Sequence, residues 1–472
     1  MAISNRSKKF FRDFGIYGIG VLGTRIITFL MIPLYTYFIQ KSDYGYFDLC
    51  LNLCLLMIPV MTLQMREGAF RFLLLTQDDS ERQSIITAIY KQFSVNLVIG
   101  CVVFAILYCF IDASYMLETG ILLVVMSFHE IILQITRGLG KNKVYATSNI
   151  LNAFFIGLLS VLFVVILKTG VEGIYLANII SRLLAIVYIE IRTKTRFFIN
   201  FSINTSSSLK RLLRYTLPLI PVSLCYWITT SCDRFFVKHY IGLEMNGLYA
   251  VAVRLTLIIQ TLSIVFYQSW QETALLQYHS KDRDVFFSKV FECFVYALTI
   301  LLVAYTFVLK MSFSWLIDQR YSQSLMFIYP LGVSALLSAM SSSFFDLGYQ
   351  CAKDTARSMI AVILTAILNF CLNFTLVPHL GVWGAITTSI CCFLFMNLYR
   401  YFDTRRYFSI SLRKTLLIPA ALIILSGIVF YSSHSLLFDM AYCLTCCMLL
   451  LACSPIDVNS IISRILHNKK TA

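Results

Sequence analysis

The chain has 472 residues, of which 58% are hydrophobic and 13% charged, and its mean hydropathy is +0.77. This composition lies outside the range of soluble domains and indicates an integral membrane protein. The net charge of +15 does not indicate a nucleic-acid partner, because most Lys and Arg residues lie in short segments between long apolar ones.

In chain order, the sequence contains fourteen apolar segments of about 20 residues, the length needed to span a bilayer as a helix. They lie near residues 14–39, 45–65, 92–111, 117–136, 145–167, 172–191, 215–237, 246–269, 289–309, 325–347, 358–377, 382–402, 415–432 and 435–453. The sequence therefore predicts an all-α membrane protein with about 14 transmembrane helices.

Positive charge predicts the orientation of these helices, because short cytoplasmic loops are enriched in Lys and Arg. If the N-terminus is inside, most of the 39 Lys and Arg fall on the cytoplasmic side. The exceptions in outside loops are Lys41, Lys168, Lys238, Lys310 and Arg320. We therefore expect both termini to be cytoplasmic.

The two halves of the chain carry related short motifs. G-V-x-G begins at Gly170 and at Gly381, in each case at the start of the sixth helix of a half. "DYGYFDL" at Asp43 and "MNGLYAV" at Met245 both introduce a second helix. These matches predict two six-helix lobes in the same orientation, related by a pseudo-two-fold axis along the membrane normal.

The longest polar interruption divides the first twelve helices evenly. The predicted organisation is an N-terminal lobe (1–192), a cytoplasmic loop between lobes (193–214), a C-terminal lobe (215–406), and helices 13 and 14 with a cytoplasmic tail (407–472).

Polar side chains recur at helical spacing on several of the spans, which predicts a polar, partly cationic cavity between the lobes. The predicted substrate-binding residues of this cavity are Arg25, Arg182, Arg234, Arg254, Thr261, Gln268, Asn369 and Asn373. The residues predicted to couple ions or to gate are Asp48, Glu130, Asp233 and Asp346. The alternative is that these side chains form hydrogen bonds between helices and only hold the bundle together.

Asp233 and Arg234 stand side by side within the seventh span. A charge at the centre of a bilayer costs about 2.5 to 3.5 kcal/mol on insertion scales, so both residues should face protein or water. Adjacent residues of a helix point about 100° apart, so we expect Asp233 and Arg234 to bind partners on separate helices and not each other. Either a gate or a fixed ion pair between helices fits this pattern.

Signatures of catalysis and of metal sites are absent from the sequence. There is no phosphate-binding G-x-x-x-x-G-K-[ST] loop, and His129-Glu130 lacks the second histidine of H-E-x-x-H. Most of the 15 cysteines lie in apolar segments and are interpreted as small buried residues. We therefore expect no catalytic or metal-binding residues and no cofactor, and transport is the favoured class.

Two blocks of sequence resemble Wzx-type polysaccharide flippases, an oligosaccharide flippase family of the multidrug/oligosaccharidyl-lipid/polysaccharide exporter superfamily. The first is "LPLIP" at 217–221 followed by "DRFF" at 233–236 and "GLY" at 247–249. The second is "NFCLNFTLVPHLGVWGA", which contains Asn369, Asn373, Pro378, Gly381, Gly384 and Ala385. The superfamily also includes multidrug exporters and the lipid II flippase, and helices 13 and 14 favour its lipid-linked sugar branches.

The resemblance implies a function and a location. It implies a flippase that moves undecaprenyl-pyrophosphate-linked oligosaccharide units to the outer leaflet of the bacterial cytoplasmic (inner) membrane by alternating access. In the related lipid II flippase, arginines on the first and eighth helices engage the pyrophosphate, and Arg25 and Arg254 lie on those helices here. Expected partners are the lipid-linked substrate, membrane lipids, a polysaccharide polymerase and a chain-length regulator, with H+ or Na+ left open as coupling ion. A multidrug or cation antiporter, a lipid II flippase and a non-transporting scaffold remain alternatives.

Overall fold

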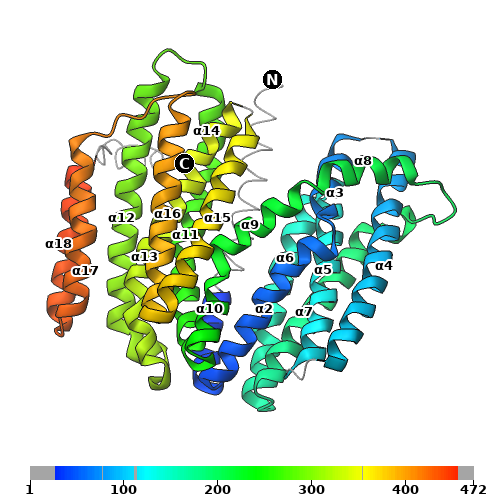
Figure 1. Ribbon diagram of the computed structural model, residues 1–472, viewed down its shortest axis with the longest axis horizontal. Helices are drawn as coiled ribbons and strands as arrows, with labels where there is room; N and C mark the ends of the chain where they lie inside the picture. The colour runs from blue at the N-terminus through cyan, green and yellow to red at the C-terminus, as the bar shows by residue number, and fades with distance from the viewer. Residues whose placement is uncertain (1–26, 77, 111–113, 353, 455–472) are drawn as a thin grey trace, which may run out of the picture. The chain divides into compact units, whose positions relative to one another are not determined.

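The computed structural model describes residues 27–76, 78–110, 114–352 and 354–454, without the side chains of Val265, Gln268, Ser269, Glu272, Leu276 and Thr355. These residues form helices joined by loops, with no β-strand in the described part of the chain (Figure 1). Within these described ranges, twelve helices are long and apolar enough to cross a membrane. The predicted all-α membrane fold is therefore confirmed.

The helices of the first half follow a short apolar helix at Ile27–Phe38. They are α2 (Lys41–Met61), α3 (Met65–Leu75), α4 (Asp79–Phe110), α5 (Met116–Gly138), α6 (Asn142–Ser160) with a π-helical turn (Val161–Ile166), α7 (Val171–Thr193), a 3-10 turn (Thr195–Phe198), α8 (Ser206–Thr216), α9 (Leu219–Ser231) and α10 (Asp233–Tyr240).

The second half continues with seven long helices and several short turns. They are α11 (Leu243–Gln277), α12 (Arg283–Leu316), a 3-10 turn (Gln319–Ser324), α13 (Leu325–Met340), a π-helical turn (Ser341–Phe345), α14 (Asp346–Cys351), α15 (Thr355–Leu380), α16 (Val382–Thr404), a 3-10 turn (Lys414–Leu416), α17 (Leu417–Ser432) and α18 (Leu436–Cys453).

Two of the fourteen predicted spans are not among the twelve long helices. The first span is described only from residue 27 onward, as the helix Ile27–Phe38. The seventh is divided at Cys232 into α9 and α10, so neither piece alone reaches the length of a span. Each of the other twelve predicted segments coincides with one of the long apolar stretches.

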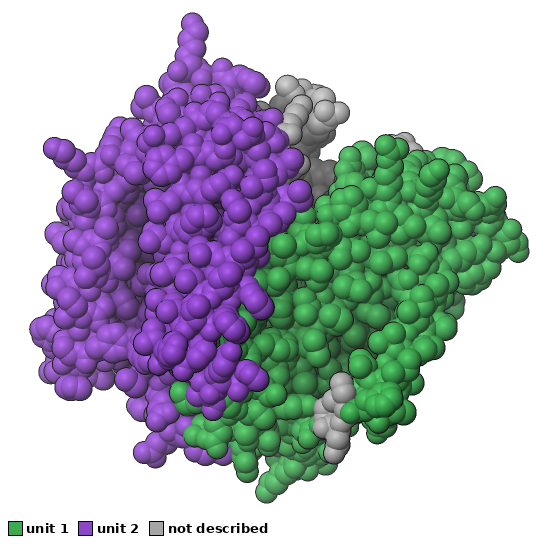
Figure 2. Space-filling view, in the orientation of Figure 1, with its two compact units in different colours: residues 1–238, 242–247 green, residues 239–241, 248–472 purple. Residues whose placement is uncertain are grey.

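By their internal contacts, the residues group into two compact units, 1–238 with 242–247 and 239–241 with 248–472 (Figure 2). The helix α9, which we assigned to the second lobe, belongs to the first unit. The reason is its packing on α2, where Trp227 Nε1 donates a hydrogen bond of 2.9 Å to the Asn52 carbonyl. The predicted lobe boundaries rest on repeated sequence motifs and not on contacts, so they remain a prediction.

The G-V-x-G motif has the same backbone geometry in both units. Gly170, directly before α7, has φ +63° and ψ −137°, and Gly381, directly before α16, has φ +63° and ψ −138°. Only glycine adopts this region without strain. The short motif that occurs twice in the sequence therefore forms the same turn before α7 and before α16.

The second repeated motif marks a close approach of two helices within the first unit. Gly45 in α2 and Gly247 near the start of α11 face each other so closely that a Cβ on either would overlap backbone atoms of the other helix. Asn246 Nδ2 donates a hydrogen bond of 2.7 Å to the Gly45 carbonyl and stabilises this contact between α2 and α11. Small residues allow such backbone contact between membrane helices.

The sequence did not predict α3 and α8 as separate helices. Leu63 and Gln64 adopt left-handed backbone angles, with φ of 46° and 53°, and so separate α2 from α3. Met65, Ala69 and Leu212 then lie in one buried apolar cluster that joins α3, α4, α5 and α8. In the second unit, α17 and α18 pack on α12 and α13 through a cluster that includes Phe307 and Phe430.

Candidate functional site

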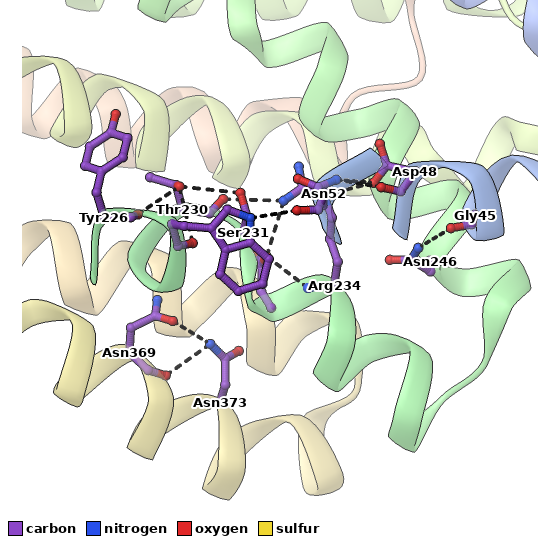
Figure 3. Close-up of polar contacts among 12 residues, drawn as sticks. Gly45, Asp48, Asn52, Tyr226, Thr230, Ser231, Arg234, Asn246, Asn369 and Asn373 are labelled. Atoms are coloured by element: carbon purple, nitrogen blue, oxygen red, sulfur yellow. Dashed lines mark hydrogen bonds and ion pairs between the residues drawn. The ribbon is translucent and has the colours of Figure 1, made fainter. Parts of the chain in front are cut away.

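Three charged side chains of the first unit meet where α10 approaches α2 (Figure 3). Arg234 Nε lies 2.9 Å from Asp48 Oδ2, and Arg234 Nη1 lies 3.5 Å from Asp233 Oδ1. The three residues are 2% to 7% exposed. Buried charges of this kind must be paired, because desolvation costs several kcal/mol per ion.

The break at Cys232 positions the charged pair at the start of a helix. Because α10 begins at Asp233, the Asp233 carboxylate accepts a hydrogen bond of 2.9 Å from the backbone N–H of Arg234. A negative side chain at a helix N-terminus is also favoured by the helix dipole. The guanidinium of Arg234 is then directed toward α2.

On α2, Asn52 supports the carboxylate from one turn away. Asn52 Nδ2 donates to the Asp48 carbonyl at 2.7 Å and lies 3.2 Å from Asp48 Oδ2. The Asn52 carbonyl in turn accepts the hydrogen bond from Trp227 on α9. One polar network therefore connects α2 with both pieces of the seventh span.

The expectation that Asp233 and Arg234 bind partners on separate helices is correct for Arg234, which pairs with Asp48 on α2. It is wrong in excluding contact between the two neighbours, since the Arg234 guanidinium also reaches Asp233 at 3.5 Å. The long arginine side chain bends back toward the last turn of α9, where its Nη1 also donates to the Thr230 carbonyl at 3.4 Å.

The other predicted residues of the first unit lie apart from this network. Glu130 Oε2 on α5 lies 3.4 Å from Arg66 Nη1 on α3. Arg182 on α7 is half-buried, and its Nη1 donates to the carbonyl and side-chain oxygens of Asn178 at 2.8 and 2.9 Å. Only one nitrogen of the Arg182 fork is used in these two bonds.

In the second unit, Asp346 on α14 belongs to a network at the ends of α15 and α16. Arg400 Nη2 lies 3.1 Å from Asp346 Oδ1, and Arg400 Nη1 donates to the Ser341 carbonyl at 2.8 Å. Ser358 donates a hydrogen bond to the same Asp346 carboxylate. Each of the four predicted acidic residues, Asp48, Glu130, Asp233 and Asp346, is thus paired with an arginine.

A neighbouring carboxylate lies in the connection before α15. Tyr407 donates a hydrogen bond of 2.6 Å to Asp354 Oδ2, and this bond is the main cause that lowers the pKa of Asp354 below its usual value. Arg357 Nε, 3.1 Å from the same oxygen, adds to the effect. Asp354 therefore stays ionised at neutral pH.

The remaining predicted substrate-binding residues are placed as follows. Asn373 Nδ2 donates to Asn369 at its carbonyl (3.0 Å) and side-chain oxygen (2.9 Å), and both residues are buried on α15 (Figure 3). Thr261 is buried on α11 and donates to the Leu257 carbonyl. Arg254 is half-buried on α11. Arg25 and the side chain of Gln268 lie outside the described residues.

Sequence reasoning missed the residues that complete these networks, namely Asn52, Arg66, Trp227 and Arg400. Arg66 directly follows the predicted span 45–65 and Arg400 lies in the last turn of the predicted span 382–402, so neither was considered as a residue of the site. The signal available for both was an arginine within one turn of the end of a predicted span.

Comparison with known proteins gives a family and a fold. A family model described as "Polysaccharide biosynthesis protein" matches residues 10–270, more than half of the chain. No curated protein sequence matches. The lipid II flippase MurJ, in an inward closed conformation, is similar over 95% of this chain and 99% of that chain, with a TM-score of 0.72 and 13% identity.

Two multidrug transporters are also similar in structure. An inward-facing MATE family transporter of the MOP superfamily matches 84% of this chain and 94% of its own, with a TM-score of 0.58 and 14% identity. The Vibrio cholerae MATE transporter VcmN matches 85% and 97%, with a TM-score of 0.53 and 12% identity. The chain therefore has the fold shared by MurJ and the MATE transporters and belongs to the polysaccharide biosynthesis protein family.

Proposed function

We propose that this protein moves undecaprenyl-pyrophosphate-linked oligosaccharide units from the cytoplasmic to the outer leaflet of the bacterial inner membrane, for assembly of O-antigen, capsule or exopolysaccharide. The observation that carries the proposal is membership of a polysaccharide biosynthesis family in a chain whose fold matches a lipid flippase over 95% of its length. By comparison, the structural match to the inward-facing MATE transporter covers only 84% of this chain.

The polar residues within the spans support such a path. A sugar hydroxyl or phosphate without a hydrogen-bond partner in hydrocarbon costs several kcal/mol, so the head of the substrate needs a polar route while its tail stays in lipid. Arginine suits a pyrophosphate because its guanidinium is always charged and offers a fork of donors. In this proposal Arg25, Arg182 and Arg254 contact the pyrophosphate, and Asn369, Asn373, Thr261 and Gln268 contact sugars.

The network of Asp48, Asp233 and Arg234 is proposed to act as a gate. An incoming anion or a proton on Asp48 would compete with the existing pair and release α10 from α2. A negative-inside membrane potential favours outward movement of an anionic head by about 2.3 kcal/mol per charge per 100 mV. H+ or Na+ acting at Asp48, Glu130, Asp233 or Asp346 would add to this driving force.

Arg254 provides the direct test of the proposal. In a strain that lacks the chromosomal gene, we expect lipid-linked oligosaccharide to accumulate in the cytoplasmic leaflet, and the wild-type chain to restore surface polysaccharide. Arg254→Ala should not restore it although its membrane abundance is normal, and Arg254→Lys should restore it in part because the charge is kept. Arg25→Ala should behave as Arg254→Ala does. Wild-type output from the double alanine variant would contradict the proposed pyrophosphate contacts.

The distribution of Lys and Arg leads to a second prediction, on orientation. Reporter fusions at residue 204, within the loop between α7 and α9, and at the C-terminus should both give cytoplasmic signals. A fusion after Lys168 should give an outside signal and serves as the control. An outside signal from residue 204 would reverse the proposed direction of transport.

A multidrug exporter is the second candidate, because the MATE transporters share the fold. Such exporters accept cations, which arginines in the spans would repel. Increased drug resistance of expressing cells, together with unchanged polysaccharide in the deletion strain, would favour this alternative.

A further inference from the structure

A cationic pocket lies on the outer surface of α8, apart from the residues considered above. Its volume is about 530 Å³, and it is lined by Ser207, Lys210, Arg211, Arg214 and Tyr215. The chain from residue 193 to 216, which includes α8, contains no Asp or Glu. Lys210 and Arg214 are exposed, and neither has a carboxylate partner within the described part of the chain.

Cation–π and aromatic contacts stabilise one wall of the pocket. The Arg71 guanidinium lies 4.4 Å from the centre of the Tyr215 ring, which meets the Phe72 ring edge to face at 5.7 Å. Arg211 lies 5.0 Å from the centre of the Phe72 ring and 2.5 Å from Glu81. These contacts restrict the side chains of Tyr215 and Arg211, which lowers the entropy lost when a ligand binds.

The position of α8 in the chain places the pocket at the membrane surface. The inner face of α8 is anchored through the buried Leu212 in the apolar cluster with α3 and α4. Only two residues separate its end at Thr216 from the apolar helix α9, which starts at Leu219. At 1.5 Å per residue, Arg214 lies within about 8 Å of the beginning of the span, the depth of lipid headgroups.

We propose that this pocket binds the phosphate of a headgroup in the adjoining leaflet. Forked guanidinium donors, a lysine and a tyrosine at headgroup depth match a phosphate ester or pyrophosphate, and juxtamembrane basic clusters attract anionic lipids. The ligand is a phosphate, whether carried by an anionic lipid or free in solution. The site is separate from the proposed transport path, so it stands or falls independently of the proposed function.

The test measures lipid binding to the purified full-length protein by native mass spectrometry. The wild type should bind dioleoyl phosphatidylglycerol more tightly than dioleoyl phosphatidylcholine. Lys210→Gln/Arg214→Gln should weaken phosphatidylglycerol binding by about twenty-five-fold, because each basic residue near the surface contributes about 1 kcal/mol to the binding of anionic lipid. The matched control Lys143→Gln/Arg192→Gln removes two exposed charges of the same unit that also lack a carboxylate partner among the described residues, and it should leave binding within about twofold.

A competition arm identifies the source of the phosphate. If inorganic pyrophosphate at millimolar concentration does not displace phosphatidylglycerol, the site is a lipid headgroup site; if it does, the site takes free phosphate as well. Equal thermal unfolding midpoints of the two double variants exclude misfolding as the cause. Equal affinity of the wild type for the two lipids, wild-type binding by the pocket variant, or an equal loss in the control would overturn the proposal.

Discussion

Replacing Arg234 with alanine is expected to cause a large loss of stability and of the proposed polysaccharide export. The variant leaves Asp48 and Asp233 buried at 2% and 5% exposure without their shared guanidinium. Removing one partner of a buried ion pair costs about 3 to 5 kcal/mol. Membrane abundance and the thermal unfolding midpoint of the purified protein should both fall.

Three further variants separate a gate from a fixed pair. Arg234→Lys should retain part of the stability, because an ammonium keeps the charge but cannot direct Nε to one carboxylate and Nη1 to another. Asp48→Asn/Asp233→Asn/Arg234→Gln removes all three charges together and should recover abundance. If export stays absent in this recovered variant, the pair acts in transport; if export returns, the pair only joins α2 to α10. Arg192→Ala, at an exposed position, is the control for loss of an arginine.

The second large effect is expected at the crossing of α2 and α11. A Cβ on Gly45 or Gly247 would overlap backbone atoms of the facing helix, and backbone cannot move aside as a side chain can. Overpacking of this kind costs typically about 1 to 3 kcal/mol and more where helices must separate. Gly45→Ala and Gly247→Ala should each lower the unfolding midpoint and the yield of folded protein.

Gly157 in α6 gives a matched control for this series. The nearest atom to an added Cβ there is 3.4 Å away on the Ile27 side chain, an ordinary contact. Gly157→Ala should therefore be neutral or slightly stabilising, since alanine favours the helix by up to about 1 kcal/mol. A Gly247→Ala variant as stable as Gly157→Ala would contradict the close packing of the crossing.

The positions of the spans were predictable because each needs a long apolar stretch, and hydropathy measures that directly. The G-V-x-G turn was predictable because the same four-residue pattern occurs twice. The division of the seventh span at Cys232 was not, since "ITTSCDRFF" contains neither proline nor glycine. Similarly, the left-handed turn at Leu63 and Gln64 is stabilised by tertiary contacts, among them the hydrogen bond from Gln64 to Ser223 on α9.

The sequence predicted which residues form the candidate site, but not which of them pair with each other. Asp48, Asp233 and Arg234 were identified because charges within apolar helices are costly. Which arginine meets which carboxylate depends on helix rotation and crossing, and a single sequence contains no direct measure of either. Arg66 and Arg400 illustrate the same limit, because their partners Glu130 and Asp346 lie 64 and 54 positions away in the sequence.

The turn shared by Gly170 and Gly381 also bears on the origin of the chain. Two turns with φ of +63° and ψ within one degree of each other, one directly before α7 and one directly before α16, are what duplication and fusion of one ancestral segment would leave. After such a duplication, lipid-facing positions can change freely among apolar residues. A turn that only glycine can form cannot change in this way, so it remains recognisable in the sequence after the surrounding helices have diverged.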